Sequence, residues 1–155
     1  MPQDLAVDLE EAVAVAAPRL RSISDFSATE KPSPGAWSRK EELGHLIDSA
    51  TNNHVRFVRA SLEPEYRGPS YDGDGWVSLH GYREMPWLDL VDFWQRYNAF
   101  LVQVVRRIPE TALDKTCFVG DHPPMTLQFL IEDYVHHMQH HLDHILKHDT
   151  EARHQ

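Results

Sequence analysis

The spacing of apolar residues in four segments is the feature of this chain that most constrains its fold. Within each segment, apolar side chains recur every three or four residues, which is the period of an α-helix with one buried face. The segments cover residues 4–24, 38–63, 86–108 and 127–148, and no pair of strands is evident between them. Four amphipathic helices bury their apolar faces against one another, so the sequence predicts an all-α four-helix bundle.

The ends of these helices carry recognisable signals. Ser38 and Glu41 have the spacing of a capping box at the start of the second helix. Thr126 is the candidate N-cap of the fourth helix, and Pro109 ends the third. Pro18 lies inside the first helix, where its missing N–H group predicts a kink or break.

Two long connections join the predicted helices, over residues 64–84 and 109–126. The first contains YRGPSYDGDGW, whose glycines, prolines and aspartates indicate an ordered surface loop. A loop of this length in a small domain is often functional, so the YDGDGW segment either covers a cavity or packs as a connector. The length of 155 residues fits one domain, spanning residues 1–155.

Charge and composition exclude several classes of protein. The net charge of −9 argues against nucleic-acid binding, which needs a basic surface. No apolar run approaches the roughly 20 residues of a membrane span, and the N-terminal segment carries acids where a secretory signal has a basic flank. Cys117 is the one cysteine, so neither an internal disulfide nor a cysteine-based zinc site can form. We expect a cytoplasmic protein without a membrane partner.

The fourth helix is rich in histidine, and its phase separates the histidines from one another. The segment holds His136, His137, His140, His141, His144 and His148. Two ligands on one helix face the same metal ion when they are three or four residues apart. His141 lies at the edge of the apolar stripe and His137 lies next to it, whereas His136 and His140 point toward solvent. His137 and His141 are therefore the candidate metal ligands of this helix.

A third ligand has to come from another helix, and the second helix offers two histidines. His54 lies within its apolar stripe, whereas His45 lies on the opposite face with Ser49, Asn52 and Arg56. If the third ligand lies beside the apolar core, His54 is the better candidate. If the metal site is open to a substrate, His45 is the better candidate, because its neighbours on the helix are polar. Helix phase alone does not decide between them.

Several motifs together resemble the DinB superfamily, and within it the YfiT-like and bacillithiol-transferase-like branch. They are WSRKEELGHLIDSATNNHVRF in the second helix, SYDGDGWVSLHGY in the long connection and DYVHHMQHHLDHI near the end, so the resemblance covers nearly the whole chain. It implies a four-helix bundle, commonly a homodimer, with a three-histidine site for a divalent metal ion. The ligands would be His45, His137 and His141, which leaves His54 as a packing residue.

The resemblance also implies an activity. Three neutral imidazoles suit zinc, nickel or iron and leave positions open for a small-molecule substrate. Relatives that are thiol S-transferases imply a metal-activated low-molecular-weight thiol that attacks an electrophile, and a metal-dependent hydrolase is the variant in which water is activated. Asp48 and Asn52 are the predicted catalytic neighbours that orient the substrate. Asp133 is a weaker candidate, better interpreted as an acid of the helix surface.

A protein that is not an enzyme is the alternative: a metal-binding or stress-response bundle whose metal is structural, or whose cavity serves sensing or contact with a partner. The third helix carries aromatic residues suited to dimer packing, namely Trp87, Phe93, Trp94 and Tyr97. Three arginines are interpreted as surface residues rather than as binders of an acidic substrate, namely Arg56, Arg59 and Arg83.

Overall fold

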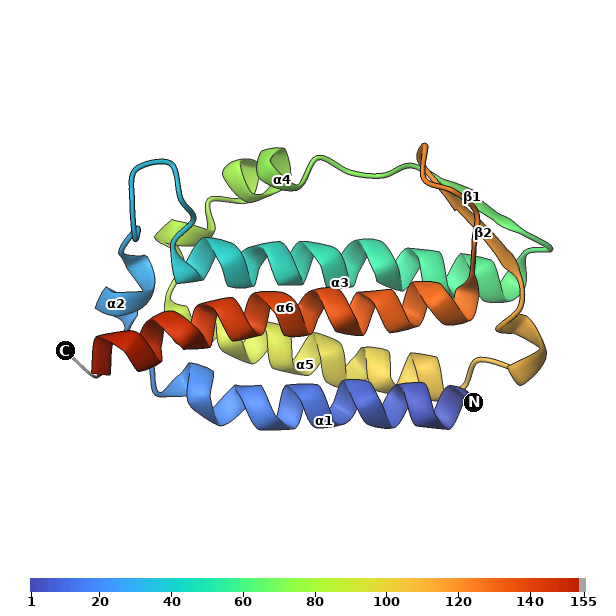
Figure 1. Ribbon diagram of the computed structural model, residues 1–155, viewed down its shortest axis with the longest axis horizontal. Coiled ribbons are helices and arrows are strands. Elements are labelled where there is room, and N and C mark those ends of the chain that lie inside the picture. Colours follow the sequence, from blue (N-terminus) through green and yellow to red (C-terminus); the bar gives the residue numbers. More distant parts are fainter. Residues whose placement is uncertain (154–155) are drawn as a thin grey trace.

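Four long helices form the body of the protein (Figure 1). The computed structural model describes the backbone of residues 1–153 and the side chains of residues 1–147. The long helices are α1 (Pro2–Arg21), α3 (Arg39–Leu62), α5 (Trp87–Arg106) and α6 (Leu127–Arg153). The predicted four-helix bundle is thus confirmed.

The four helices pack around a common axis, and their directions do not alternate along the chain. Helix α1 contacts α5 and α6, and α3 also contacts α5 and α6, so α1 and α3 lie diagonally across the bundle. Helices α3 and α5 start at the same end and run in the same direction, opposite to α1 and α6 (Figure 1). The connection from α3 to α5 therefore has to return along the whole length of the bundle.

This returning connection is more regular than the sequence predicted. It contains strand β1 (Tyr66–Gly68), helix α4 (Gly73–His80) and a 3₁₀ turn, η1 (Tyr82–Glu84). Helix α4 begins where the Asp72 side chain accepts a hydrogen bond from the Gly75 amide, at 3.1 Å. Both α4 and η1 contact α3, so the connection covers the side of α3 that faces away from the bundle core (Figure 1).

A small sheet corrects the expectation that no strands pair. Strand β2 (Thr116–Val119) pairs in parallel with β1 and antiparallel with β3 (Met125–Thr126), in the order β1–β2–β3. The sheet lies at the end of the bundle where α3 ends and α6 begins (Figure 1). Strands of two to four residues are too short to show an alternating pattern, and β1 is far in sequence from β2, so no local signal predicts that pairing.

The ends of the first helices differ from the sequence expectation. Helix α1 continues through Pro18 to Arg21, so the chain does not break at the proline. A short helix, α2 (Asp25–Thr29), follows in the segment before α3, and its N-cap is Ser24. No helix in the described part of the chain is both long and apolar enough to cross a membrane.

The predicted caps of α3 and α6 are both formed. The Ser38 side chain accepts a hydrogen bond from the Glu41 amide at 3.2 Å, and the Glu41 carboxylate accepts one from the Ser38 amide at 3.0 Å. The Thr126 hydroxyl accepts a hydrogen bond from the Phe129 amide at 3.0 Å. These caps fix where each helix begins. Burial of apolar side chains in the core, which includes the fully buried Trp94, fixes the rotation of each helix about its own axis. Together they set the direction of every polar side chain on α3 and α6.

Candidate metal centre

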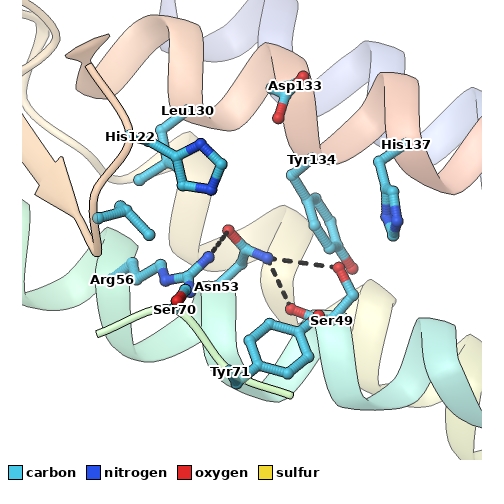
Figure 2. Close-up of a pocket in the computed structure, with 11 residues that line it drawn as sticks. Ser49, Asn53, Arg56, Ser70, Tyr71, His122, Leu130, Asp133, Tyr134 and His137 are labelled. Atoms are coloured by element: carbon cyan, nitrogen blue, oxygen red, sulfur yellow. Dashed lines mark hydrogen bonds between the residues drawn. The ribbon is translucent and has the colours of Figure 1, made fainter. Parts of the chain in front are cut away.

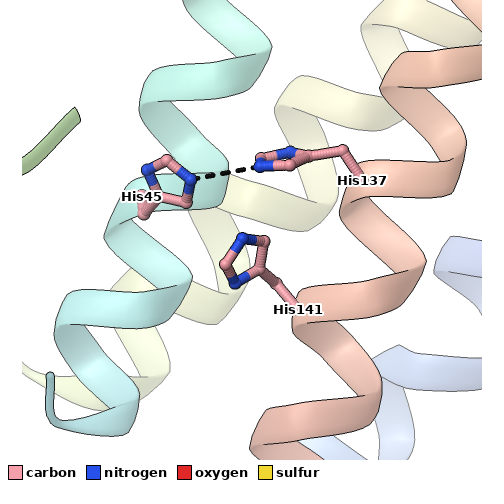
Figure 3. A group of neighbouring side chains, drawn as sticks. All are labelled: His45, His137 and His141. Atoms are coloured by element: carbon pink, nitrogen blue, oxygen red, sulfur yellow. Dashed lines mark hydrogen bonds between the residues drawn. The ribbon is translucent and has the colours of Figure 1, made fainter. Parts of the chain in front are cut away.

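Three histidines from two helices meet at one point between α3 and α6. Figure 3 shows His45 of α3 directed toward His137 and His141 of α6. One ring nitrogen from each residue lies within 4.8 Å of the other two. The Nε2 atoms of His45 and His137 are 3.2 Å apart. The structure therefore brings together the three residues that the sequence predicted as ligands.

The other histidines lie elsewhere. His54 follows His45 by nine residues, which is about half a turn out of phase on the helix, and its Nδ1 lies 2.7 Å from the Tyr97 hydroxyl of α5. It is the packing residue that the resemblance implied. His136 and His140 are exposed, as their phase predicted. The side chain of His148 lies outside the described residues.

Burial keeps two of the clustered imidazoles uncharged at neutral pH. Burial, reinforced by the neighbouring His141 and His137, lowers the pKa of His45 to about 4. Burial likewise lowers the pKa of His137, and His141 adds to that effect. An uncharged imidazole has a free lone pair, which is the form that binds a metal ion.

A buried glutamate holds the third histidine in place. Glu42 is 6% exposed, and its two carboxylate oxygens lie 2.8 Å from Nδ1 of His141 and 2.7 Å from Nδ1 of His144. Burial raises the pKa of Glu42, but the hydrogen bonds from His141 and His144 outweigh it and lower the pKa overall. A carboxylate on Nδ1 directs the opposite nitrogen of His141 into the cluster, as it does in many metalloproteins. The sequence analysis missed Glu42, although its position three residues before His45 places it on the same side of α3.

The long connection closes one side of the cluster. A Cβ atom added at Gly73, in the first turn of α4, would lie 3.4 Å from Cε1 of His45. The Trp37 ring packs on the same histidine, with ring centroids 4.9 Å apart. The YDGDGW segment therefore lies against His45, and its Tyr71 lines a cavity, in line with the interpretation that the segment covers one. Nδ1 of His45 is buried there and has no hydrogen-bond partner in the described structure.

The two predicted catalytic neighbours contact other groups. Asp48 is 1% exposed, and its Oδ1 accepts a hydrogen bond from the Tyr82 hydroxyl at 2.6 Å and lies 3.0 Å from Nδ1 of His80. Burial raises the pKa of Asp48 although both of these hydrogen bonds act to lower it. The amide of Asn52 donates to the Asp48 backbone carbonyl at 2.9 Å. Asp48 thus ties the long connection to α3, and a catalytic role for either residue stays a prediction.

A cavity of about 280 Å³ opens beside His137 (Figure 2). Its walls come from α3, α6, the long connection and the segment that follows β2. The polar residues that line it are Ser49, Asn53, Arg56, Ser70, Tyr71, His122, Asp133, Tyr134 and His137. A metal ion held by the histidines would therefore have space for a small molecule next to it, as a catalytic site requires.

Arg56 is the residue for which the surface interpretation was wrong. It is 8% exposed, because residues 69–71 of the long connection lie over it and its guanidinium donates a hydrogen bond to the Pro69 carbonyl at 3.2 Å. The other two arginines are exposed as predicted: Arg59 pairs with Glu63 at 2.9 Å, and Arg83 donates to the Thr29 carbonyl. Asp133 is also exposed, at the edge of the cavity.

Comparisons with known proteins agree with this architecture. Residues 8–145 match the DinB superfamily. The solved structure of YfiT from Bacillus subtilis, described as a probable metal-dependent hydrolase with an unusual four-helix bundle topology, aligns with a TM-score of 0.84 and 21% sequence identity. That alignment covers 97% of this chain and 87% of YfiT, and at this identity it shows the shared fold. A comparison with curated proteins finds no match. Since the family match spans most of the sequence, the chain belongs to the DinB superfamily.

Proposed function

We propose that this protein is a metal-dependent enzyme that binds one divalent cation through His45, His137 and His141. The observation that carries the proposal is the convergence of three ring nitrogens at the edge of a cavity large enough for a substrate. The description of YfiT as a probable metal-dependent hydrolase supports it. A purely structural metal, the alternative predicted from the sequence, would need no such cavity.

The residues of the chain fit a divalent cation. Two uncharged imidazole nitrogens face each other at 3.2 Å, a distance at which one proton or one cation has to lie between them. Glu42 fixes the orientation of His141, and the half-buried position of the cluster limits the access of bulk water. The nitrogen donors suit zinc, nickel or iron. A cation bound there lowers the pKa of a thiol or a water molecule, which supplies a nucleophile at neutral pH.

Within this class, we propose transfer of a low-molecular-weight thiol to an electrophile, with hydrolysis as the second candidate. The resemblance of the sequence to thiol S-transferases supports the first, and the description of YfiT supports the second. In either case the cavity beside His137 would hold the molecule that is attacked, and the YDGDGW segment would shield the reacting atoms from solvent.

Two assays on the metal-loaded protein separate the candidates. In the first, a chromogenic aryl halide is mixed with cysteine or glutathione, and the rate of arylation is followed. In the second, a nitrophenyl ester is used without thiol. A metal-dependent rate that rises with thiol concentration supports the transferase, and a thiol-independent rate of ester cleavage supports the hydrolase. If a chelator changes neither rate, the non-catalytic alternative replaces both.

Substitution of Glu42 tests how the site is built. Glu42→Gln keeps the shape of the side chain but weakens its hydrogen bond to Nδ1 of His141. We expect the affinity for the metal to fall about 10–100-fold, as it does when other carboxylates that hydrogen-bond to a metal-binding histidine are replaced. A saturating concentration of metal should still fill the site. Competition with a chromogenic chelator measures the affinity. Glu132→Gln, an exposed position on α6, serves as the control. Equal affinities in Glu42→Gln and wild type would show that Glu42 does not support the metal ligand.

We also propose that the protein is a homodimer that associates through α5. Of the aromatic residues predicted for this role, Trp87 and Trp94 are buried within the chain and are therefore unavailable. Phe93 and Phe100 are 50% and 52% exposed on α5, and Tyr97 lies between them. Aromatic residues of this kind are enriched at interfaces. The cytoplasmic location stays a prediction from the sequence.

Light scattering on a size-exclusion column tests the dimer. We expect the wild type to elute with twice the mass of the chain, and the double variant Phe93→Glu, Phe100→Glu to elute as a monomer, because charges cannot be buried in an apolar contact. Phe129→Glu, which alters an exposed aromatic residue on α6, should remain a dimer. A monomeric wild type would refute the proposal.

A further inference from the structure

We propose that Arg56 forms a binding site for an anionic group, a carboxylate or a phosphate, in the cavity beside the histidine cluster. The inference rests on the proposed function and extends it, because it assigns the substrate to the class of small anionic molecules. The substrate would bind with its charged group at Arg56 and its reacting atom near His137 (Figure 2).

The first argument is the charge of a buried side chain that lacks an ionic partner. Arg56 is 8% exposed, and an arginine side chain keeps its charge at neutral pH. A buried charge is costly unless an opposite charge accompanies it. Among the described residues, no carboxylate forms an ion pair with Arg56, and its hydrogen-bond acceptors are the neutral Asn53 amide at 3.5 Å and the Pro69 carbonyl at 3.2 Å. A bound anion would supply the missing charge.

The second argument is the number and arrangement of donors. A guanidinium has five N–H groups in a planar fork, and those two hydrogen bonds engage only part of them. The rest are available at the wall of the cavity, since Arg56 lines it. A planar fork binds a carboxylate or a phosphate through two parallel hydrogen bonds.

The third argument is that neighbouring residues hold the guanidinium in a fixed position. The Asn53 amide donates to the Ser49 backbone carbonyl at 2.8 Å, which directs its oxygen toward Arg56 (Figure 2). The guanidinium carbon also lies over the Tyr71 ring, 5.6 Å from the ring centroid. A donor that is fixed before the ligand arrives loses less conformational entropy on binding, so this arrangement favours affinity.

The carboxylate among the residues that line the cavity does not compete for Arg56. Figure 2 places the Asp133 carboxylate on α6, across the cavity from Arg56 on α3. Asp133 is exposed to solvent, so its charge is screened by water. An anion in the cavity is repelled from the side of Asp133 and attracted to the side of Arg56.

The position of Arg56 on α3 constrains the layout of the ligand. His45 and Arg56 are eleven residues apart, which is three helical turns and roughly 16 Å along one face of the helix. Ser49 and Asn53 lie between them on the same face and line the cavity. Arg56 and the histidine cluster thus lie at different levels along α3, so the ligand carries its anionic group apart from its reacting atom.

Nuclear magnetic resonance of the ¹⁵N-labelled full-length protein tests this site directly. The Nε–Hε signals of the arginines are followed while sodium acetate or sodium phosphate replaces sodium chloride at constant ionic strength. Each titration is made on the protein as purified and again after metal removal, so that anions bound to a metal are recognised. We expect the Arg56 signal to shift with saturation in the millimolar range in both preparations. The signal of Arg59, which pairs with Glu63 on the surface, should not saturate.

Variants assign the effect to the guanidinium. Arg56→Gln should bind the tighter of the two anions at least about tenfold more weakly, because a hydrogen bond to a charged donor is lost. Arg56→Lys keeps the charge without the planar fork and should bind with intermediate affinity, whereas Arg59→Gln should bind like the wild type. For the variants, backbone amide shifts of Asn53 and Tyr71 report binding, and thermal melts confirm folding.

The outcomes separate this proposal from the metal proposal. Tighter binding of acetate identifies a carboxylate ligand, and tighter binding of phosphate identifies a phosphate ligand. No saturable shift at Arg56 in the wild type, or unchanged affinity in a folded Arg56→Gln, overturns the anion site even when metal binding is normal. Saturable anion binding in a protein that takes up no metal keeps the anion site and refutes the metal-dependent function.

Discussion

His137→Ala is expected to lower the metal content from about one ion per chain to nearly none, while the bundle stays folded. Two imidazoles rarely hold a divalent ion tightly, so removal of any one of the three ligands should have the same effect, including His45→Ala and His141→Ala. Helicity should change little, because the clustered histidines are half-buried and lie beside the core rather than within it. Elemental analysis of protein purified without a histidine tag measures the metal, and circular dichroism measures the helicity.

Two matched variants control for the loss of a histidine in general. His136→Ala removes an exposed histidine next to His137, and His54→Ala removes the histidine that bonds to Tyr97. Both should keep about one ion per chain. Equal metal loss in these variants would refute the assignment of ligands. A wild type that takes up no zinc, nickel or iron after reconstitution would instead favour the non-catalytic alternative.

Gly44→Ala is expected to cause the largest loss of stability among single substitutions near the site. A Cβ at position 44 would overlap the ring of Tyr82, which packs directly on the backbone of α3. The ring would have to move out of a buried position, and the hydrogen bond from its hydroxyl to Asp48 would be lost. Overpacking and a buried carboxylate with fewer partners together cost about 3 kcal/mol in the free energy of unfolding. The melting temperature should fall by about 6–12 °C.

Gly73→Ala is the matched control for this effect. It adds the same methyl group on the same side of the protein, but the nearest atoms belong to the His45 ring at 3.4 Å and 3.5 Å, which is ordinary contact. Its melting temperature should stay within about 2 °C of the wild type, since replacing glycine by alanine at a compatible position is neutral or slightly stabilising. Similar melting temperatures for the two variants would show that the packing of the Tyr82 ring on α3 does not require a glycine at position 44.

The bundle was predictable because its signals are local. The apolar periods give the helices, and the caps at Ser38 and Thr126 give the starts of α3 and α6 to within a residue. The pair His137 and His141 follows from the same period, since four residues return a helix to nearly the same face. The strands were missed because each is too short to show a pattern, and the pairing of β1 with β2 joins segments that are distant in the sequence.

The rest of the site depends on contacts that no local pattern encodes. His45 and His54 lie on opposite faces of one helix, and only the position of Tyr97 on α5 shows that His54 already has a partner. Glu42 was missed and Arg56 was misinterpreted as a surface residue for another reason. The long connection and α6 cover the polar face of α3, so polar residues there are buried and contact one another. Once the segment that covers such a face is known, polar residues on that face can be predicted to form buried contacts.

The path of the long connection divides the protein into a part that resists change and a part that tolerates it. The histidines and Glu42 are carried by helices whose other faces form the core, so their geometry is tied to the stability of the whole bundle. The opposite wall of the cavity includes Ser70 and Tyr71, which belong to no helix. Insertions or substitutions in that wall can alter which molecule fits while the metal ligands keep their positions. Directed evolution for a new substrate would therefore succeed most readily with libraries confined to residues 69–71.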